Sequence, residues 1–332
     1  MIDSTLPLID LHRHLEGCVR LETMIEIGRV HNLSLPAWDV ETLRQHVVIT
    51  KPEPGVMAFL FPRIQWMINT LVDYDACRRI TYESVEDAHC EGIDYLELRF
   101  SPRFMSEPHK LDAAGVVEAV VNGAQEAMND TGIKVELIGI MSRTYGVQNC
   151  WAELKALLTQ KEHIVALDLA GDEIAFPGHL FVEHFRRGRD TGWNVTVHAG
   201  EATGAESIWQ AIQDLGATRI GHGIRAIEDP TLLAYLAEHR IGLETNLTSN
   251  VQTSVIPDYA SHPLRQFLEC GIPASINSDD PAISGIDLPY EYDVAAPAAG
   301  LSLEQIRQVQ ANALETAFLS PEEKQVLSSV RY

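Results

Sequence analysis

Short β-rich runs that end in polar residues alternate with amphipathic helical segments along most of the chain. From residue 90 onward, each run is followed by a helical pattern, a glycine and then the next run. Together with a first run near the N-terminus there are eight: 8–11, 95–100, 135–140, 164–169, 195–198, 219–222, 241–245 and 272–277. Eight βα units predict an α/β fold of the (β/α)8, or TIM-barrel, type; an open doubly wound sheet is the weaker alternative.

The spacing of these runs is uneven. About eighty residues separate the first run from the second, and this interval carries helical patterns over 55–71 and 76–89. A long loop after a barrel strand lies over the C-terminal mouth, where barrel enzymes carry their chemistry. We therefore expect one barrel domain over residues 1–332, with a helical insertion at about 20–90 over the mouth. The sequence leaves two interpretations of the insertion open, a lid and extra packing helices.

The net charge and the cysteine pattern exclude several classes of binding partner. A formal net charge of −22 argues against contact with nucleic-acid backbones or anionic membranes, because both need clustered Lys and Arg. The five cysteines are scattered and contain no Cys-x-x-Cys pair, which is typical of reduced thiols and gives no thiolate metal site. No secretory signal or bilayer-spanning run is visible. We expect a cytoplasmic enzyme acting on a small molecule, with no indication of its oligomeric state.

Metal-ligating residues follow several of the runs. His12 and His14 lie two residues apart, so on an extended strand both side chains point to the same face. His198 ends the fifth run and Asp279 follows the eighth, and three imidazoles with a carboxylate suit zinc. Each residue alone has an ordinary explanation, such as a hydrogen bond to a carbonyl or a helix cap. Because polar residues at barrel strand ends converge, their combination favours a metal site.

The end of the fourth run indicates how many ions are held. Binuclear barrel hydrolases commonly bridge two ions with a carboxylated lysine there, but residues 167–173 contain no lysine. One Zn²⁺ per chain is therefore expected. A single catalytic zinc lowers the pKa of its water to roughly 7 and supplies hydroxide at neutral pH.

Hydrolysis at a ring carbon needs further groups beside the metal. His222, at the end of the sixth run, is suited to orient and deprotonate the water. Glu201, three residues past His198, can return over the metal through Gly200 and protonate the substrate; its alternative is an acid favoured by a helix N-terminus. If the last strand ends between the two aspartates, Asp280 can bind substrate while Asp279 binds metal. Gly171 suits either close approach to a flat ligand or a plain tight turn.

At this point the chain resembles the adenosine deaminase family of metal-dependent barrel hydrolases, most closely its bacterial members. The resemblance covers nearly the whole chain. It is carried by the segments 137–144 (LIGIMSRT), 168–173 (DLAGDE), 196–201 (TVHAGE), 219–223 (RIGHG) and 247–250 (LTSN). It implies a zinc enzyme that converts adenosine or deoxyadenosine and water to inosine or deoxyinosine and ammonia.

The resemblance also implies a role for each site residue. His12, His14, His198 and Asp279 would be the zinc ligands. Glu201 would protonate purine N1, His222 would act on the water, Asp280 would contact N7, and the Gly171 N–H would contact N3. His14 and Glu16 are expected to contact the substrate as well. Glu16 lies two residues past His14, so the strand period predicts that its side chain points into the same cavity. The His-x-Glu and Pro-Cys-x-x-Cys pattern of cytidine-type zinc deaminases is absent.

One residue departs from the family pattern. Typical adenosine deaminases read His-Leu-Asp-Gly, with the Asp contacting the ribose, whereas this chain has Glu16 at that position. Related enzymes that act on free adenine resemble His-Leu-Glu-Gly, and Ser278 leans weakly the same way. Adenine or another 6-aminopurine is therefore the alternative substrate. An amidohydrolase of a non-purine ring and an inactive binding protein are further alternatives, although no ligand is missing.

Overall fold

The computed structural model describes residues 1–61 and 63–329. Its eight strands form one sheet in which neighbours in sequence are also neighbours in space, and each pair from β1–β2 to β7–β8 is parallel. A doubly wound sheet reverses its strand order at a switch point, and this sheet does not. The strands are β1 (Ile9–His14), β2 (Tyr95–Phe100), β3 (Lys134–Ser142), β4 (Ile164–Ala170), β5 (Asn194–Ala199), β6 (Arg219–His222), β7 (Gly242–Thr245) and β8 (Ala274–Ile276). The expected (β/α)8 barrel is confirmed.

The barrel closes at the seam between β1 and the segment that follows β8. The N–H of Asp279 donates to the His12 carbonyl, and the N–H of His14 donates to the Asp279 carbonyl, both at 2.8 Å. Deeper in the seam, the Leu11 N–H donates to the side chain of Asn277 at 2.9 Å. These bonds fix the last segment directly against the strand that carries the histidine pair.

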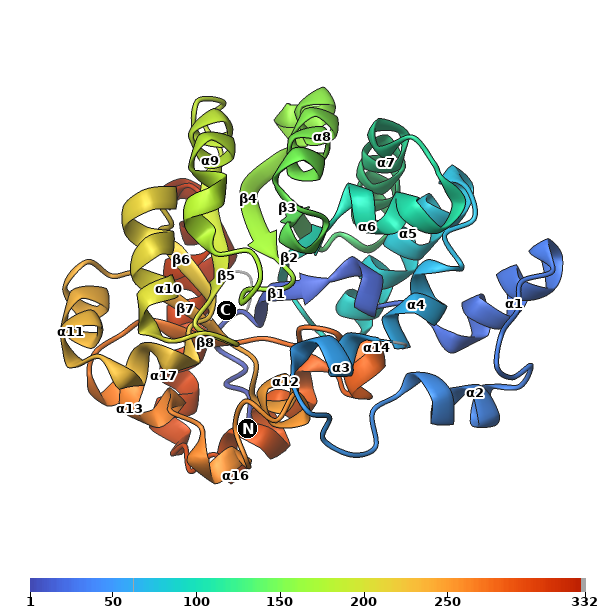
Figure 1. Cartoon of the computed structure of the whole chain (residues 1–332). Coiled ribbons are helices and arrows are strands. Elements are labelled where there is room, and N and C mark those ends of the chain that lie inside the picture. Colours follow the sequence, from blue (N-terminus) through green and yellow to red (C-terminus); the bar gives the residue numbers. More distant parts are fainter. Residues whose placement is uncertain (62, 330–332) are drawn as a thin grey trace.

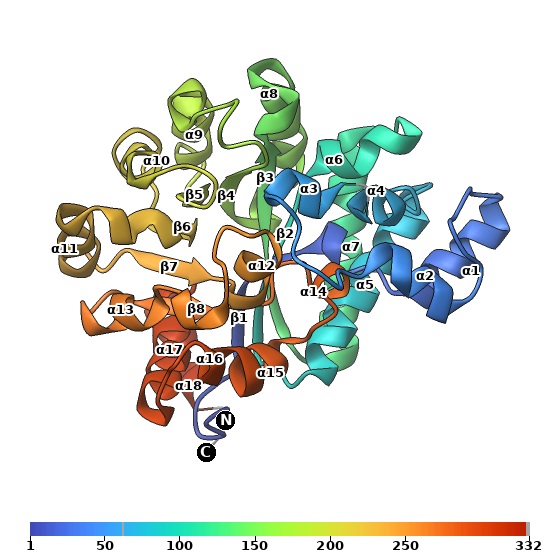
Figure 2. The ribbon, with the colours of Figure 1, turned by 60° about the horizontal axis from the view of Figure 1, so that its bottom comes forward.

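Helices surround the strands (Figures 1 and 2). Those after β2 are α6 (Pro102–Ser106), α7 (Ala113–Thr131), α8 (Val147–Leu157), α9 (Val182–Arg189), α10 (Ala205–Gln210), α11 (Pro230–Glu238), α12 (Leu247–Gln252), α13 (Leu264–Glu269), α14 (Pro281–Ser284), α15 (Leu288–Tyr290), α16 (Ala296–Ala298), α17 (Leu303–Thr316) and α18 (Pro321–Ser328). Leu96, Leu98 and Phe100 of β2 belong to the large apolar core. The alternate residues Glu97 and Arg99 are equally buried but join a network of charges instead. The interior of this barrel therefore contains a buried network of charged side chains.

Five helices lie between β1 and β2: α1 (Leu21–His31), α2 (Val40–Val47), α3 (Val56–Leu60), α4 (Arg63–Ile68) and α5 (Tyr74–Cys90). In both views α1 and α2 project to one side, whereas α3 and α4 lie closer to the strands (Figures 1 and 2). Side chains of α3 and α4 line the same cleft as the strand-end histidines. In the described part of the chain, no helix combines the length and apolar character that crossing a bilayer requires.

Candidate active site

The candidate site is a cleft at the C-terminal ends of the strands, with about 930 Å³ of empty space that includes its opening to solvent. Its polar lining includes most of the residues expected from the sequence: His14, Glu16, Gly171, His198, Glu201, His222, Asp279 and Asp280. His12 is fully buried and contacts the rings of His14 and His198. Apolar side chains from the insertion, among them Phe59 and Ile64, form another part of the wall.

Four potential ligand atoms converge in this cleft. His14 Nε2 lies 3.3 Å from His12 Nε2 and 3.1 Å from His198 Nε2. Asp279 Oδ1 lies 3.3 Å from His12 Nε2 and 3.4 Å from His14 Nε2. Donor atoms that share one metal ion at about 2.0–2.2 Å lie roughly 3 Å or slightly more from one another, so these spacings suit a single bound ion. The His and Asp cluster can therefore hold a metal ion.

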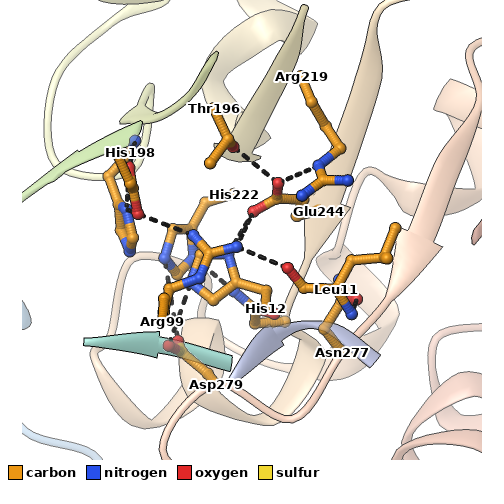
Figure 3. Close-up of polar contacts among 12 residues, drawn as sticks. Leu11, His12, Arg99, Thr196, His198, Arg219, His222, Glu244, Asn277 and Asp279 are labelled. Carbon is orange, nitrogen blue, oxygen red and sulfur yellow. Dashed lines mark hydrogen bonds and ion pairs between the residues drawn. The ribbon is translucent and has the colours of Figure 1, made fainter. Parts of the chain in front are cut away.

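Two buried carboxylates orient the ligand histidines, as Figure 3 shows for Glu244. Glu244 Oε2 lies 2.7 Å from Nδ1 of His12, and Asp168 Oδ2 lies 2.9 Å from Nδ1 of His198. Each carboxylate accepts the Nδ1 proton and leaves Nε2 free to face the centre of the cluster. This is the usual arrangement around metal-binding histidines.

One guanidinium joins these two carboxylates. Arg99 donates to Asp168 at 2.9 Å and to Glu244 at 2.7 Å, and Glu244 is also paired with Arg219. Although burial alone would raise it, the pKa of Glu244 is held well below its usual value by Arg99 and Arg219. Sequence reasoning did not identify this network. Its available signal was the charged residues at alternate positions of otherwise apolar runs, as in 95–100.

Protonation states in the cluster favour a cation. Burial lowers the pKa of His198, and lowers that of His14 well below its usual value, so both rings favour the neutral, ligating form. Burial would raise the pKa of Asp279, but the rings of His12, His222 and His14 hold it well below its usual value. Burial would lower the pKa of His12, but Asp279 and Glu244 raise it. Asp279 is therefore the carboxylate of the cluster, and His12 is the ring that it attracts most strongly.

Two candidate site residues adopt the left-handed backbone conformation that non-glycine residues seldom use. Asp279 has φ +62° and His222 has φ +60°. Such strain concentrates at functional sites. β8 ends at Ile276, before both aspartates, and the turn lets Asp279 and Asp280 line one cleft. The expected break in the strand thus lies earlier than between the two residues.

His222 lies beside the cluster. Its Nε2 is 3.6 Å from Glu201 Oε2 and 3.9 Å from Asp279 Oδ2. On its other side, the amide nitrogens of Asn246 and Asn250 lie 3.2 and 3.1 Å from Nδ1. The buried Oδ1 of Asn246 has no hydrogen-bond partner.

Glu201 is buried in the wall of the cleft rather than at a helix terminus. α10 begins at Ala205, and its N-cap residue is Gly204. Burial, reinforced by Asp279, Glu173 and Asp280, raises the pKa of Glu201 well above its usual value. This shift favours the protonated, proton-donating form more than in an exposed glutamate.

Asp280 is a second buried acid in the cleft. It precedes α14 but makes no side-chain capping bond to it. Burial and the neighbouring charges of Asp279 and Glu16 raise its pKa well above the usual value. A Cβ atom on Gly17 would lie 1.9 Å from Asp280 Oδ1, so the absence of a side chain at Gly17 makes room for this carboxyl.

Glu16 reaches the cleft by a different route from the one expected. β1 ends at His14, and Glu16 lies in the 3₁₀ turn η1 (Leu15–Gly17), so the alternation of a strand does not set its direction. Its Oε1 accepts the Ser101 N–H at 2.6 Å, whereas its buried Oε2 has no protein partner. Burial raises the pKa of Glu16 to about 7. The strand-period argument was wrong, although Glu16 does line the cleft.

Gly171 follows β4 with φ +105°, a conformation that favours glycine. A Cβ atom here would lie 2.4 Å from Thr144 Oγ1. The turn and the close approach of Thr144 both require glycine, and its backbone lines the cleft.

Comparison with known proteins identifies the family. The family model described as adenosine deaminase matches residues 7–331. An adenosine deaminase of Vibrio parahaemolyticus is 61% identical over 324 residues, which cover 98% of this chain and 97% of that protein. An adenosine deaminase of Photorhabdus laumondii is 58% identical over 327 residues, with 98% of each chain covered.

Solved structures agree with this assignment. The adenine deaminase of Arthrobacter aurescens has a TM-score of 0.90 at 26% identity, with 97% of each chain covered. The Arabidopsis N6-mAMP deaminase has a TM-score of 0.83 at 27% identity and covers 99% of this chain and 98% of its own. The sequence match, the barrel and the cluster at its mouth lead to one conclusion: this chain belongs to the adenosine deaminase family.

Proposed function

We propose that this chain is a zinc-dependent adenosine deaminase that hydrolyses adenosine and 2′-deoxyadenosine to inosine or 2′-deoxyinosine and ammonia, as in purine salvage. The observation that carries this proposal is the convergence of a metal-ligand cluster with two buried acids of raised pKa in one cleft. The adenosine deaminase relatives, similar over nearly the full chain, support the substrate.

The proposed metal ligands are His12, His14, His198 and Asp279, and the ligand set and its spacing support zinc. When bound, the ion would lower the pKa of a coordinated water to roughly 7 and so make a nucleophile available at neutral pH. Asp168 and Glu244 fix the rings of His198 and His12 for this task. His222, at the edge of the cluster, would orient the water and accept its proton through Nε2.

Glu201 would supply a proton to the purine. Its raised pKa favours the protonated form, and its position beside His222 brings it to the reacting side of the cleft. Donation to ring nitrogen N1 withdraws electron density from C6, where water adds. Glu201 would thus act as the general acid.

Asp280 and Gly171 would orient the purine ring. N7 is a hydrogen-bond acceptor and needs a donor, and the raised pKa of Asp280 favours the protonated carboxyl that can donate. The N–H of Gly171 would donate to N3 from the other side of the cleft. These contacts would select a purine over a ring without N7, which distinguishes this proposal from a non-purine amidohydrolase.

Glu16 is the reason to consider a second candidate substrate, free adenine. Its unpartnered Oε2 would accept a ribose hydroxyl of adenosine, or instead the N9–H of adenine. A buried acceptor left without a partner costs about 1–3 kcal/mol, enough to change preference tenfold or more. The relatives favour the nucleoside, so we expect adenosine to be preferred.

A substrate panel tests the proposal directly. Loss of the adenine absorbance would be followed for adenosine, deoxyadenosine, adenine and modified adenosines, and kcat/KM compared. We expect the two nucleosides to exceed adenine by about tenfold or more. A protein that deaminates adenine far faster than adenosine contradicts the proposal, and one that deaminates neither contradicts both candidates. The cytoplasm remains the expected compartment, which fractionation of the source cells would test.

A further inference from the structure

Glu173 lies behind the candidate site. It follows β4 in the loop that begins at Gly171 and is only 5% exposed. It does not line the substrate cleft. Instead it lines a second cavity, and among the described residues His198 alone lines both. Glu173 belongs to the segment 168–173 noted in the sequence, and so far it has entered only as one of the groups that raise the pKa of Glu201.

The Glu173 carboxylate accepts hydrogen bonds from three backbone N–H groups of the loop after β5. Oε1 accepts from Gly200 at 2.7 Å. Oε2 accepts from Ala202 at 2.8 Å and from Thr203 at 3.1 Å. The donors lie immediately before and after Glu201, so one side chain fixes the backbone on both sides of the proposed acid.

This loop has few other constraints among the described hydrogen bonds. Ser207 Oγ also accepts from the Gly200 N–H, at 2.8 Å. Gly200 has φ +68°, and a Cβ atom there would lie 2.5 Å from a carbon of Ile208, so the turn is tightly packed on one side. The Arg225 N–H, from the segment after β6, also donates to the Gly200 carbonyl at 3.0 Å. The hydrogen bonds to Glu173 tie residues 200–203 to the loop after β4 as well.

Arg143 accompanies Glu173 in the second cavity and is also buried. Its Nη2 donates to the carbonyls of His198 and Leu169, both at 2.7 Å. Arg143 therefore fixes the end of β5 at the proposed ligand His198, while Glu173 fixes the next few residues. The guanidinium also balances the buried charge of Glu173.

We propose that Glu173 is a positioning residue that acts through Glu201: by accepting three N–H groups it holds the loop so that the Glu201 carboxyl meets the ring nitrogen. This inference rests on the proposed function of Glu201. A carboxylate can accept all three bonds. A glutamine cannot, because its amide nitrogen is a donor and would face N–H groups.

The test compares Glu173→Gln with Glu173→Asp, which keeps the charge but is one methylene shorter. Glu206→Gln is the matched control, because Glu206 lies on the same cavity but is exposed. We expect Glu173→Gln to lower kcat for adenosine by about 10- to 100-fold, the scale of a small misplacement, with KM and zinc content little changed. The Asp variant should fall between, and the control should match wild type.

Two readouts separate positioning from a general structural role. Hydrogen exchange of the amides of residues 200–203 should become about tenfold faster in Glu173→Gln but not in the control. In a Glu201→Gln background, Glu173→Gln should cost little further activity, because it acts through a group already removed. If Glu173→Gln does not fold, the same measurements on Glu173→Asp decide.

Failure of the positioning role of Glu173 can be distinguished from failure of the proposed function. Unchanged amide exchange, or an equal loss of kcat in the wild-type and Glu201→Gln backgrounds, overturns the positioning role. If wild-type protein does not deaminate adenosine, the proposed function fails, and the exchange measurement alone then decides whether Glu173 holds the loop.

Discussion

Replacing Glu201 by glutamine tests whether the proposed reaction needs the proton that Glu201 would donate to N1. Glutamine keeps the shape and hydrogen-bonding reach of the protonated glutamic acid but cannot transfer a proton to N1. Burial raises the pKa of Glu201 and so favours the neutral form of the wild-type side chain. Glutamine matches that neutral form in size and charge.

The expected loss follows from this difference. General acid catalysis contributes at least about 10²-fold, so kcat should fall by that factor or more, which is about 2.7 kcal/mol of transition-state stabilisation. Folding stability should stay equal or rise, because the wild-type chain must take up a proton at Glu201 on folding and glutamine need not. Zinc content should stay near that of wild type, since Glu201 is not a proposed ligand.

The assay is steady-state deamination of adenosine at pH 7, with thermal unfolding and metal analysis of the same samples. Glu206→Gln provides a neutralised carboxylate nearby that should leave all three unchanged. Turnover of Glu201→Gln near the wild-type rate would refute the role of Glu201 as acid. Loss of zinc together with activity would instead indicate that Glu201 helps to bind the metal.

Three further changes test other parts of the site. Glu16→Asp should still prefer adenosine to adenine in kcat/KM, and a switch of preference to adenine would contradict the nucleoside assignment. Gly17→Ala should lower kcat/KM by about tenfold or more with zinc retained, because its Cβ displaces Asp280; wild-type kinetics would contradict that requirement for space. Burial raises the pKa of Glu153 from 4.5 to about 7, so the folded state binds more protons across this window and stability falls as pH rises through it. The unfolding free energy of Glu153→Gln should decrease by up to about 3 kcal/mol less between pH 5 and pH 8 than that of wild type, as measured by urea unfolding. The same decrease in both proteins would contradict the raised pKa of Glu153.

The barrel and the convergence of His and Asp side chains at its mouth could be predicted because their signals are local. Each strand is a short apolar run, and His12, His14 and His198 stand at the ends of such runs. Barrel geometry then brings strand ends together without knowledge of any particular contact. The family resemblance added the roles of Glu201, Asp280 and Gly171.

Residues that act through partners were not predictable in the same way. Glu244 and Asp168 orient histidines from other strands, and Glu173 binds a loop that begins almost thirty residues later in sequence. These pairings depend on strand register and on loop conformation, which single-chain periodicity does not specify. The direction of Glu16 failed for a related reason, because the chain leaves the strand and turns at η1 before reaching it.

The central claim is that the His and Asp cluster binds one zinc ion and that deamination requires this ion. Zinc titration of metal-free protein tests it most directly, because metal binding and activity are measured together. Protein stripped with a chelator would receive increasing zinc while adenosine deamination is measured, with His12→Ala as the ligand-deficient control. The account predicts negligible activity without metal, a linear rise, and a plateau at about one equivalent per chain. Full activity in verified metal-free protein, or a requirement for two ions per chain, would contradict it.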